Sequence, residues 1–288
     1  MERERWEKVY RLLVALDTHA FRGVFQAAAV LAVYFWAVIH DRPVSWACQR
    51  VNWTGGVPFR KLPSQPTMSR RLRQPDVLAL LTAVGEDPVV GGRGEETCVK
   101  IVDGKALPVG ACSKAPDARW GRATSGMAKG YKLFAIWGRG PLPIAWRVDS
   151  MNVSEENMAA QMLPELKGRG GYVLGDKLYD SNRLYDIAAS VGHQLIAARK
   201  RVGKGIGHHR HSPARLRSID LLHGQFGREL YDLRRNIEHN FGNLTNFGGG
   251  LAPLPSWVRC LRRVRMWVHA KLIISALHHH PPNAPAVA

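Results

Sequence analysis

The order of strand-like and helix-like segments between residues 98 and 199 constrains the fold of this chain more than any other feature. Three apolar, β-branched segments follow one another, and the turn "GRGP" separates the second from the third. A helix, a strand, a second helix and a last strand come next, and two long helices end the chain. This order predicts an α/β fold with a mixed sheet and flanking helices.

The expected strands span residues 98–110, 131–137, 142–149, 172–176 and 194–199. The expected helices span residues 155–166, 181–192, 225–245 and 255–277. Residues 200–218 show no clear periodicity and predict a loop or an insertion.

The sequence predicts two domains, of which the first is N-terminal and helical. Residues 1–82 are predicted to be all-helical. Residues 83–97 are rich in Gly, Pro and acidic residues and are predicted to form a linker. Residues 98–277 form the second domain, with a short basic insertion near 199–222, and residues 278–288 form a tail. The apolar run 24–39 is shorter than the roughly 20 residues that span a bilayer, so we expect a buried helix.

The charge distribution predicts a polyanionic partner. The net charge is +18, from 41 basic and 23 acidic residues. No Asp or Glu follows Glu238, although five Lys and Arg residues do, and a second basic block runs from Arg199 to Arg217. Clusters of this kind favour nucleic acid, with a membrane surface as the alternative. The four cysteines form no CxxC pair, which favours a reducing, cytoplasmic location and excludes a cysteine zinc site.

Two carboxylates stand out in the strand segments. Asp103 lies within "KIVDG", and Asp176 directly follows the strand "YVLG". An acid in an apolar strand is costly unless it is paired or binds a metal ion. The alternative is a turn former, because "DG" is a common turn pair and Gly175 precedes Asp176.

A third candidate lies on the segment "RELYDLRRNIEHNFGNL" (228–244), whose apolar residues recur at steps of three and four. The segment predicts an amphipathic helix on which Tyr231, Arg234 and Glu238 form a second stripe beside the apolar one. This stripe favours a site. The alternative is an ordinary Arg–Glu pair, worth about 0.3 kcal/mol.

Two short helices are expected near the N-terminus, at 43–53 and 62–76. The second begins at Ser64 or Gln65, with Pro66 in its first turn and Pro75 as its stop. Three arginines lie on it: Arg70, Arg71 and Arg73. The pair is either a helix-turn-helix that reads DNA or an ordinary helical domain with a basic face.

Three motifs together resemble a known family. "IVDG", "LGDKLYDS" and "YDLRRNIEHNFGNL" are similar to the catalytic signatures of the DDE transposases of bacterial insertion sequences, specifically the IS4-like group. Tyr231, Arg234 and Glu238 match the Y-x2-R-x3-E-x6-K signature of that group, whereas Thr245 stands where its lysine would be. The resemblance covers about residues 98–275.

The resemblance implies an RNase H-like catalytic domain and a DNA transposase that cleaves and transfers strands at the ends of an insertion sequence. Asp103, Asp176 and Glu238 would be the catalytic acids and would hold two Mg²⁺ ions, with Mn²⁺ as a substitute. Tyr231 and Arg234 would hold a phosphate. Three lysines would contact the DNA backbone: Lys129, Lys132 and Lys177.

The implied partner is double-stranded DNA, as element ends and as target, bound by a homodimer. No membrane and no small-molecule substrate is expected, and the implied location is the bacterial cytoplasm, in association with the nucleoid. Two alternatives stay open at this point. One is a DNA-binding remnant without activity, and the other is an RNase H-like nuclease that cleaves without strand transfer.

Overall fold

The computed structural model describes residues 1–18, 24–91, 97–123, 126–166, 168, 170–200, 205–206, 210–251 and 253–279. The chain divides into two compact units. The helical unit holds Met1–Arg93, Asn243–Val258 and Arg263–Ala288, and the sheet unit holds Gly94–Gly242 and Arg259–Arg262. Most of the C-terminal helix α12 (Leu261–His279) therefore belongs with the N-terminal helices, whereas the sequence analysis assigned it to the second domain.

The helical unit is built around the apolar run that the sequence analysis expected to be a buried helix. Its N-terminal elements are α1 (Glu2–Leu16), α2 (Ala27–Ile39), α3 (Val44–Ala47), η1 (Arg50–Asn52), α4 (Gln65–Arg71), α5 (Pro75–Glu86) and α6 (Pro88–Gly91). Nearly every residue of α2 is buried. The Trp36 ring stacks on Trp53 at a centroid distance of 4.7 Å, and Trp6 meets both rings edge-on. Among the described residues, no helix is both long enough and apolar enough to cross a membrane.

A buried lysine ties α12 to the end of α2. The Lys271 ammonium donates to the Val38 carbonyl at 2.9 Å, to Asp41 Oδ1 at 2.7 Å and to the Gly249 carbonyl at 2.8 Å. Burial lowers the pKa of Lys271, and Asp41 opposes that shift. The three acceptors satisfy all three donors of the ammonium, which makes its burial tolerable.

The predicted boundary between the domains is partly helical. Helix α5 continues to Glu86, and α6 occupies Pro88–Gly91, so the first half of the expected linker folds into helices. Pro75, expected as a helix stop, begins α5 instead, because proline suits the first turn of a helix as well as the position after one. Residues 92–96 lie outside the described residues.

The sheet unit confirms the predicted mixed sheet. Its strands are β1 (Val99–Pro108), β2 (Arg119–Ala123), β3 (Gly126–Trp137), β4 (Ala145–Ser150), β5 (Gly171–Gly175) and β6 (His193–Ala197). Strands β1, β2 and β4 pair antiparallel with β3, while β5 lies parallel between β1 and β6. Strand β2 was not predicted, because its sequence "RWGRA" has one large apolar side chain and no alternating pattern.

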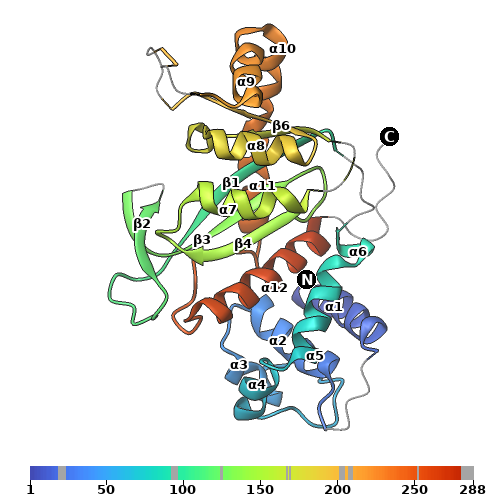
Figure 1. Cartoon of the computed structure of the whole chain (residues 1–288). Coiled ribbons are helices and arrows are strands. Elements are labelled where there is room, and N and C mark those ends of the chain that lie inside the picture. Colours follow the sequence, from blue (N-terminus) through green and yellow to red (C-terminus); the bar gives the residue numbers. More distant parts are fainter. Residues whose placement is uncertain are drawn as a thin grey trace. The chain divides into compact units, whose positions relative to one another are not determined.

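Helices cover both faces of the sheet. Helices α7 (Glu155–Met162) and α8 (Asn182–Ser190) lie side by side over one face, where they enclose Val102, Phe134 and Val173 (Figure 1). On the other face, Phe241 of α11 (Asn236–Thr245) meets the Trp137 ring at 6.2 Å. The short 3-10 turns η2 (Leu163–Glu165) and η3 (Lys177–Tyr179) follow α7 and β5.

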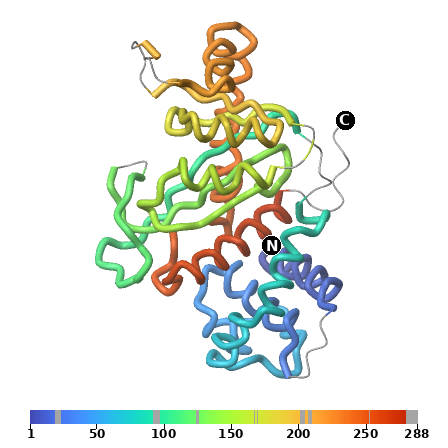
Figure 2. Tube along the Cα trace, viewed as in Figure 1, coloured from blue at the N-terminus to red at the C-terminus, as the bar shows by residue number. Residues whose placement is uncertain are grey.

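Two helix predictions need correction. Residues 213–218 were expected to belong to a loop, but α9 (Pro213–His223) begins there and leads into α10 (Gln225–Asp232), both orange in Figure 2. The buried residues of α9 include Ala214 and Ser218, so its inner face carries little apolar signal. The long helix expected at 225–245 is interrupted by the 3-10 turn η4 (Leu233–Arg235).

Candidate active site

Asp103 lies on β1, and Asp176 directly follows the parallel neighbouring strand β5. Strand β1 pairs with β5 in the register Ile101↔Leu174, and each aspartate stands two residues beyond that pair. Side chains alternate along a strand, so both carboxylates belong to the same side of the sheet. Strand β5 ends at Gly175, and the pair therefore marks the end of this ladder.

Each aspartate accepts a local backbone hydrogen bond that orients it. Asp103 Oδ1 accepts the Gly104 N–H at 2.7 Å, and Asp176 Oδ1 accepts the Leu178 N–H at 2.7 Å. Asp176 is thereby the N-cap of η3, so the turn-former reading of this residue is correct. A capping carboxylate keeps further lone pairs that can hold a ligand, so the two roles are compatible.

Burial and neighbouring negative charges destabilise the ionised form of Asp103. Burial is the main cause that raises the pKa of Asp103 to about 6. The carboxylates of Glu155 and Asp176 raise it further, while the Gly104 N–H and the Arg234 guanidinium oppose the rise. The Asp103 carboxylate is thus costly to ionise in its buried place.

A buried hydroxyl lies among these carboxylates. Tyr179 is 1% exposed, and its hydroxyl makes no hydrogen bond of good geometry within the described part of the chain. Burial raises the pKa of Tyr179 well above its ordinary value, and the charges of Glu155, Asp103 and Asp176 add to that shift. The Tyr179 hydroxyl therefore keeps its proton at neutral pH.

Tyr231 and Arg234 are brought to the same place from α10 and η4. The Tyr231 hydroxyl donates to the Gly175 carbonyl at 3.2 Å, directly before Asp176. The Arg234 guanidinium lies 5.9 Å from the Tyr231 ring centroid and lowers the pKa of Asp103. An arginine beside two aspartates can hold a phosphate group that approaches the carboxylates.

Glu238 is not gathered with the two aspartates. It is exposed in the first turn of α11, and among the described residues no three His, Cys, Asp or Glu side chains lie close enough to hold a metal ion. The physical reason is η4, because a 3-10 turn has three residues per turn and rotates the phase of the following helix. The stripe expected from a continuous helix is therefore broken between Arg234 and Glu238.

Glu155 is a site residue that the sequence analysis missed. Its carboxylate accepts a hydrogen bond from Lys132 Nζ at 2.8 Å, and both side chains are nearly buried. Its negative charge, in the first turn of α7, also adds to the burial that raises the pKa of Asp103. The sequence marks Glu155 only as an acid after the Ser154 cap, a position that usually serves the helix itself.

The three lysines expected to contact DNA have different environments. Lys132 is paired with Glu155, and Lys129 Nζ donates to the Ser113 carbonyl at 2.7 Å. Lys177 is exposed in η3. A cleft of about 780 Å³ opens beside Asp176, and its lining includes Trp120, Arg122, Lys132, Lys177 and Lys200. Lys132 and Lys177 thus line the same cleft as Asp176.

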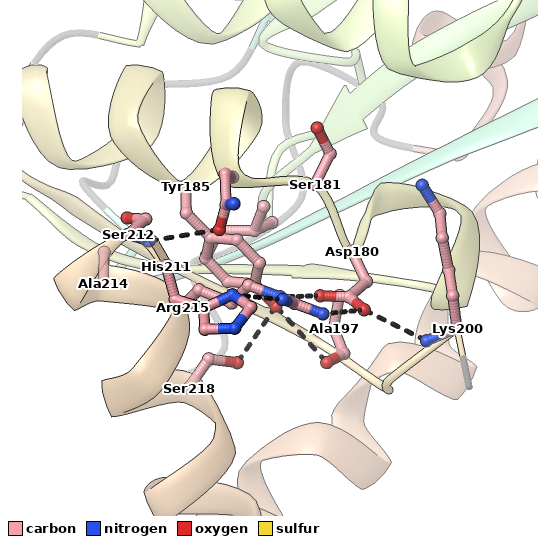
Figure 3. Close-up of polar contacts among 12 residues, drawn as sticks. Asp180, Ser181, Tyr185, Ala197, Lys200, His211, Ser212, Ala214, Arg215 and Ser218 are labelled. Carbon is pink, nitrogen blue, oxygen red and sulfur yellow. Dashed lines mark hydrogen bonds and ion pairs between the residues drawn. The ribbon is translucent and has the colours of Figure 1, made fainter. Parts of the chain in front are cut away.

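A buried ion pair anchors the segment that follows Asp176. The Asp180 carboxylate accepts two hydrogen bonds from Arg215 and one from the Lys200 N–H (Figure 3). Arg215 Nη1 is also within 2.9 Å of His211 Nδ1. This group joins η3, the end of β6 and the start of α9.

The arginines of α4 also differ. Arg71 is buried and forms two hydrogen bonds with Asp76, at 3.1 and 2.6 Å, so its guanidinium joins α4 to α5. Arg70 and Arg73 are exposed. Helix α4 is capped by Ser64, one of the two residues expected at its start. Turn η1 and a loop separate it from α3, which is only four residues long.

The donor chemistry of the site fits a hard divalent cation. Asp103 and Asp176 offer carboxylate oxygens two residues beyond the Ile101↔Leu174 pair, and burial followed by the Glu155 and Asp176 charges raises the pKa of Asp103. Mg²⁺ and Mn²⁺ prefer oxygen ligands and keep several waters, so two carboxylates are an adequate start.

A mixed six-stranded sheet with flanking helices and aspartates at adjacent strand positions is an RNase H-like α/β fold. The sequence profile described as "Transposase DDE domain" matches residues 94–276, more than half of the 288-residue chain. The chain belongs to this family of DDE transposases, whose activity is transposition and whose partner is DNA. No curated protein and no solved structure matches the chain.

Proposed function

We propose that the chain is the transposase of an IS4-like insertion sequence and that it cleaves and transfers DNA strands at the ends of its own element. The observation that carries the proposal is the adjacency of Asp103 and Asp176 at the end of the β1–β5 ladder. Tyr231 and Arg234 support it, because α10 and η4 bring them to the same strand end.

Asp103 and Asp176 would hold the metal ions, with Glu238 as the third ligand, and two such ions supply activation of the attacking oxygen and stabilisation of the leaving one. This role of Glu238 requires α11 to approach the aspartates when DNA binds. Arg234 orients the scissile phosphate by bidentate contact. Lys177 and Lys132 neutralise neighbouring phosphates along the cleft.

The two steps of the reaction use the same residues. Water attacks the phosphodiester first and frees a 3′-hydroxyl, and that hydroxyl then attacks a phosphodiester of the target. Both attacks are in-line displacements at one site, so the carboxylates and Arg234 serve each in turn. A homodimer would bring two element ends together.

DNA recognition would come from the helical unit as well as from the cleft. Arg70 and Arg73 are exposed on and just after α4, whose N-terminus is capped by Ser64. Arg71 contributes indirectly, because it holds α4 against α5 through Asp76. The short α3 and the loop after it make the arrangement a loose version of a helix-turn-helix.

The proposal is tested with alanine variants of Asp103, Asp176 and Glu238, assayed for Mg²⁺-dependent cleavage and for DNA binding in Ca²⁺. Each variant should lose cleavage while its dissociation constant for DNA stays close to the wild-type value. Full cleavage by the Asp103 or Asp176 variant would contradict the proposed site. Full cleavage by the Glu238 variant alone would show that Glu238 is not one of the metal-binding catalytic residues.

One observation favours a second function, that of a DNA-binding remnant without catalysis. Glu238 is exposed and apart from the aspartates, and Thr245 replaces the lysine of the family signature. Such a remnant would bind DNA and cut nothing under Mg²⁺ or Mn²⁺. Cleavage without joining would instead identify a nuclease.

A further inference from the structure

Asp180 lies at the far end of the turn that carries Asp176. The 3-10 turn η3 has Asp176 as its N-cap and Asp180 as its C-cap. The Asp180 side chain is 1% exposed, less than that of any other carboxylate in the ion pairs described above. An ionised carboxylate so deeply buried requires partners that satisfy it.

Those partners come from two segments distant in sequence. Arg215 Nε donates to Asp180 Oδ1 at 2.7 Å and Arg215 Nη2 to Asp180 Oδ2 at 2.9 Å, a bidentate pair. The Lys200 N–H donates to Asp180 Oδ2 at 3.0 Å. Burial alone would raise the pKa of Asp180, but these donors hold it below its ordinary value, so the group is charged at neutral pH.

Asn182, at the start of α8, makes two further contacts close to this pair. Asn182 Oδ1 accepts the Ser212 N–H at 3.1 Å, and Asn182 Nδ2 donates to the Arg210 carbonyl at 3.3 Å. Figure 3 shows Asp180 between Lys200 on one side and Arg215 with His211 on the other. Asp180 and Asn182 therefore hold the backbone at Lys200, Arg210 and Ser212.

The same contacts orient two residues of the cleft. Asp176 and Lys200 both line it. Lys200 is held by Asp180 at its backbone, and its Nζ reaches Glu156 Oε2 at 3.8 Å. The Ser181 hydroxyl donates to the other oxygen of Glu156 at 2.6 Å. The segment 176–180 thus carries the Asp176 carboxylate at one end and, through Asp180 at the other, holds the backbone of a lysine that lines the same cleft.

Stability alone is a weak reason for this arrangement. The desolvation cost of a buried ion pair offsets most of its Coulombic attraction, so an apolar pair of similar volume is often as stable. A bidentate pair, however, fixes distance and direction, which a site for phosphoryl transfer requires.

We propose that Asp180 and Arg215 form a positioning pair, which sets the place of the Asp176 carboxylate and of Lys200 at the cleft. This inference rests on the proposed role of Asp176 as a metal-binding catalytic residue. Without the pair, η3 loses the anchor at its C-terminal end, and the Leu178 N–H no longer holds Asp176 Oδ1 in one position.

The test compares Asp180→Asn with Asp76→Asn. Asp76 belongs to a second buried, bidentate Arg–Asp pair, with Arg71, in the helical unit, so it controls for the loss of such a pair as such. The first readout is hydrogen exchange of residues 177–181 in metal-free protein, and the second is Mn²⁺ affinity measured by electron paramagnetic resonance. The melting temperature of each variant is measured as well, so that a local effect can be told from a general loss of stability.

Asp180→Asn should speed exchange in residues 177–181 at temperatures where the protein is folded and should weaken Mn²⁺ binding about tenfold, as loss of outer partners of metal ligands does. Asp76→Asn should leave both values unchanged. The double variant Asp180→Asn/Arg215→Met removes the stranded guanidinium. It should recover thermal stability while Mn²⁺ binding stays weak.

An Asp180→Asn protein with wild-type exchange at 177–181 and wild-type Mn²⁺ affinity would overturn the inference, whatever its melting temperature. Recovery of Mn²⁺ affinity together with stability in the double variant would also overturn it. Failure of wild-type protein to bind Mn²⁺ would contradict the proposed function, and the exchange measurement, which needs no metal, would still decide whether the pair positions the turn.

Discussion

Replacement of Asp103 by asparagine should stabilise the metal-free protein at neutral pH while it abolishes cleavage. The Asp103 carboxylate is buried beside Glu155 and Asp176, and these surroundings raise its pKa from 3.8 to about 6. Asparagine has the same shape and no charge. Its Oδ1 can still accept the Gly104 N–H, so the local backbone hydrogen bond is retained.

The size of the effect follows from the raised pKa. The rise from 3.8 to about 6 spans about two pH units, and each corresponds to about 1.4 kcal/mol. The folded state binds the proton more tightly than the unfolded state, so wild-type stability falls as pH rises from 4 to 6. The asparagine variant has no carboxylate to ionise, so its stability does not fall in this way. The difference in the free energy of unfolding between the variant and wild type should grow from near zero at pH 4 to at most ~3 kcal/mol at pH 7.

The assay is urea unfolding of both proteins in EDTA at several pH values between 4 and 7.5. Added Mg²⁺ should then narrow the difference, because only wild-type protein keeps both carboxylate ligands. An asparagine variant that is less stable than wild type at pH 7, or a difference that does not change with pH, would refute the reasoning about Asp103.

Three further substitutions test other parts of the fold. Tyr231→Phe removes the hydrogen bond to the Gly175 carbonyl, so it should cost about 1 kcal/mol in urea unfolding and should lower kcat for cleavage. An unchanged kcat would show that this contact of α10 does not serve the reaction. Ser64→Ala removes the cap that accepts the Thr67 N–H at 3.4 Å, and a loss of ~0.5 kcal/mol is expected for so long a bond. Lys271→Met should cost about 2 kcal/mol in denaturant unfolding, because the Val38 and Gly249 carbonyls lose their donor. An unchanged free energy of unfolding would contradict this role of Lys271.

The positions of Asp103 and Asp176 are predictable from sequence because each lies in, or directly after, an apolar strand pattern. Their adjacency is not, because it depends on the parallel pairing Ile101↔Leu174 between segments 73 positions apart. The resemblance of the motifs supplied the expectation that the two aspartates meet. The last pair of the register, Ile101↔Leu174, stands two residues before each aspartate, and, after burial, the Asp176 charge also raises the pKa of Asp103.

The missed features have local physical causes. Glu155 is a helix-start acid in sequence, and only the fold of β3 and α7 brings it to Lys132 and Asp103. The 3-10 turn η4 interrupts a segment whose periodicity is otherwise helical, and it separates Arg234 from Glu238. Periodicity counts apolar residues and does not register a change of helix type within three residues.

The polar network around Asp180 could not be predicted either. Asp180 and Arg215 lie far apart in sequence, and neither belongs to an apolar pattern. Such pairs arise from tertiary packing, which places α9 against β6 and α8. The sequence analysis treated residues 199–222, which include Arg215, as a basic insertion and therefore had no reason to connect Arg215 with the turn after Asp176.

The measurement that tests the central claim most directly is cleavage and joining of DNA that carries the ends of the element, in Mg²⁺, with wild type beside Asp103→Asn. The account predicts joined product from wild type, none in Ca²⁺, and none from the variant although it is folded and binds DNA. Joined product from Asp103→Asn at the wild-type rate would contradict the claim that the carboxylates at the end of the β1–β5 ladder carry the reaction.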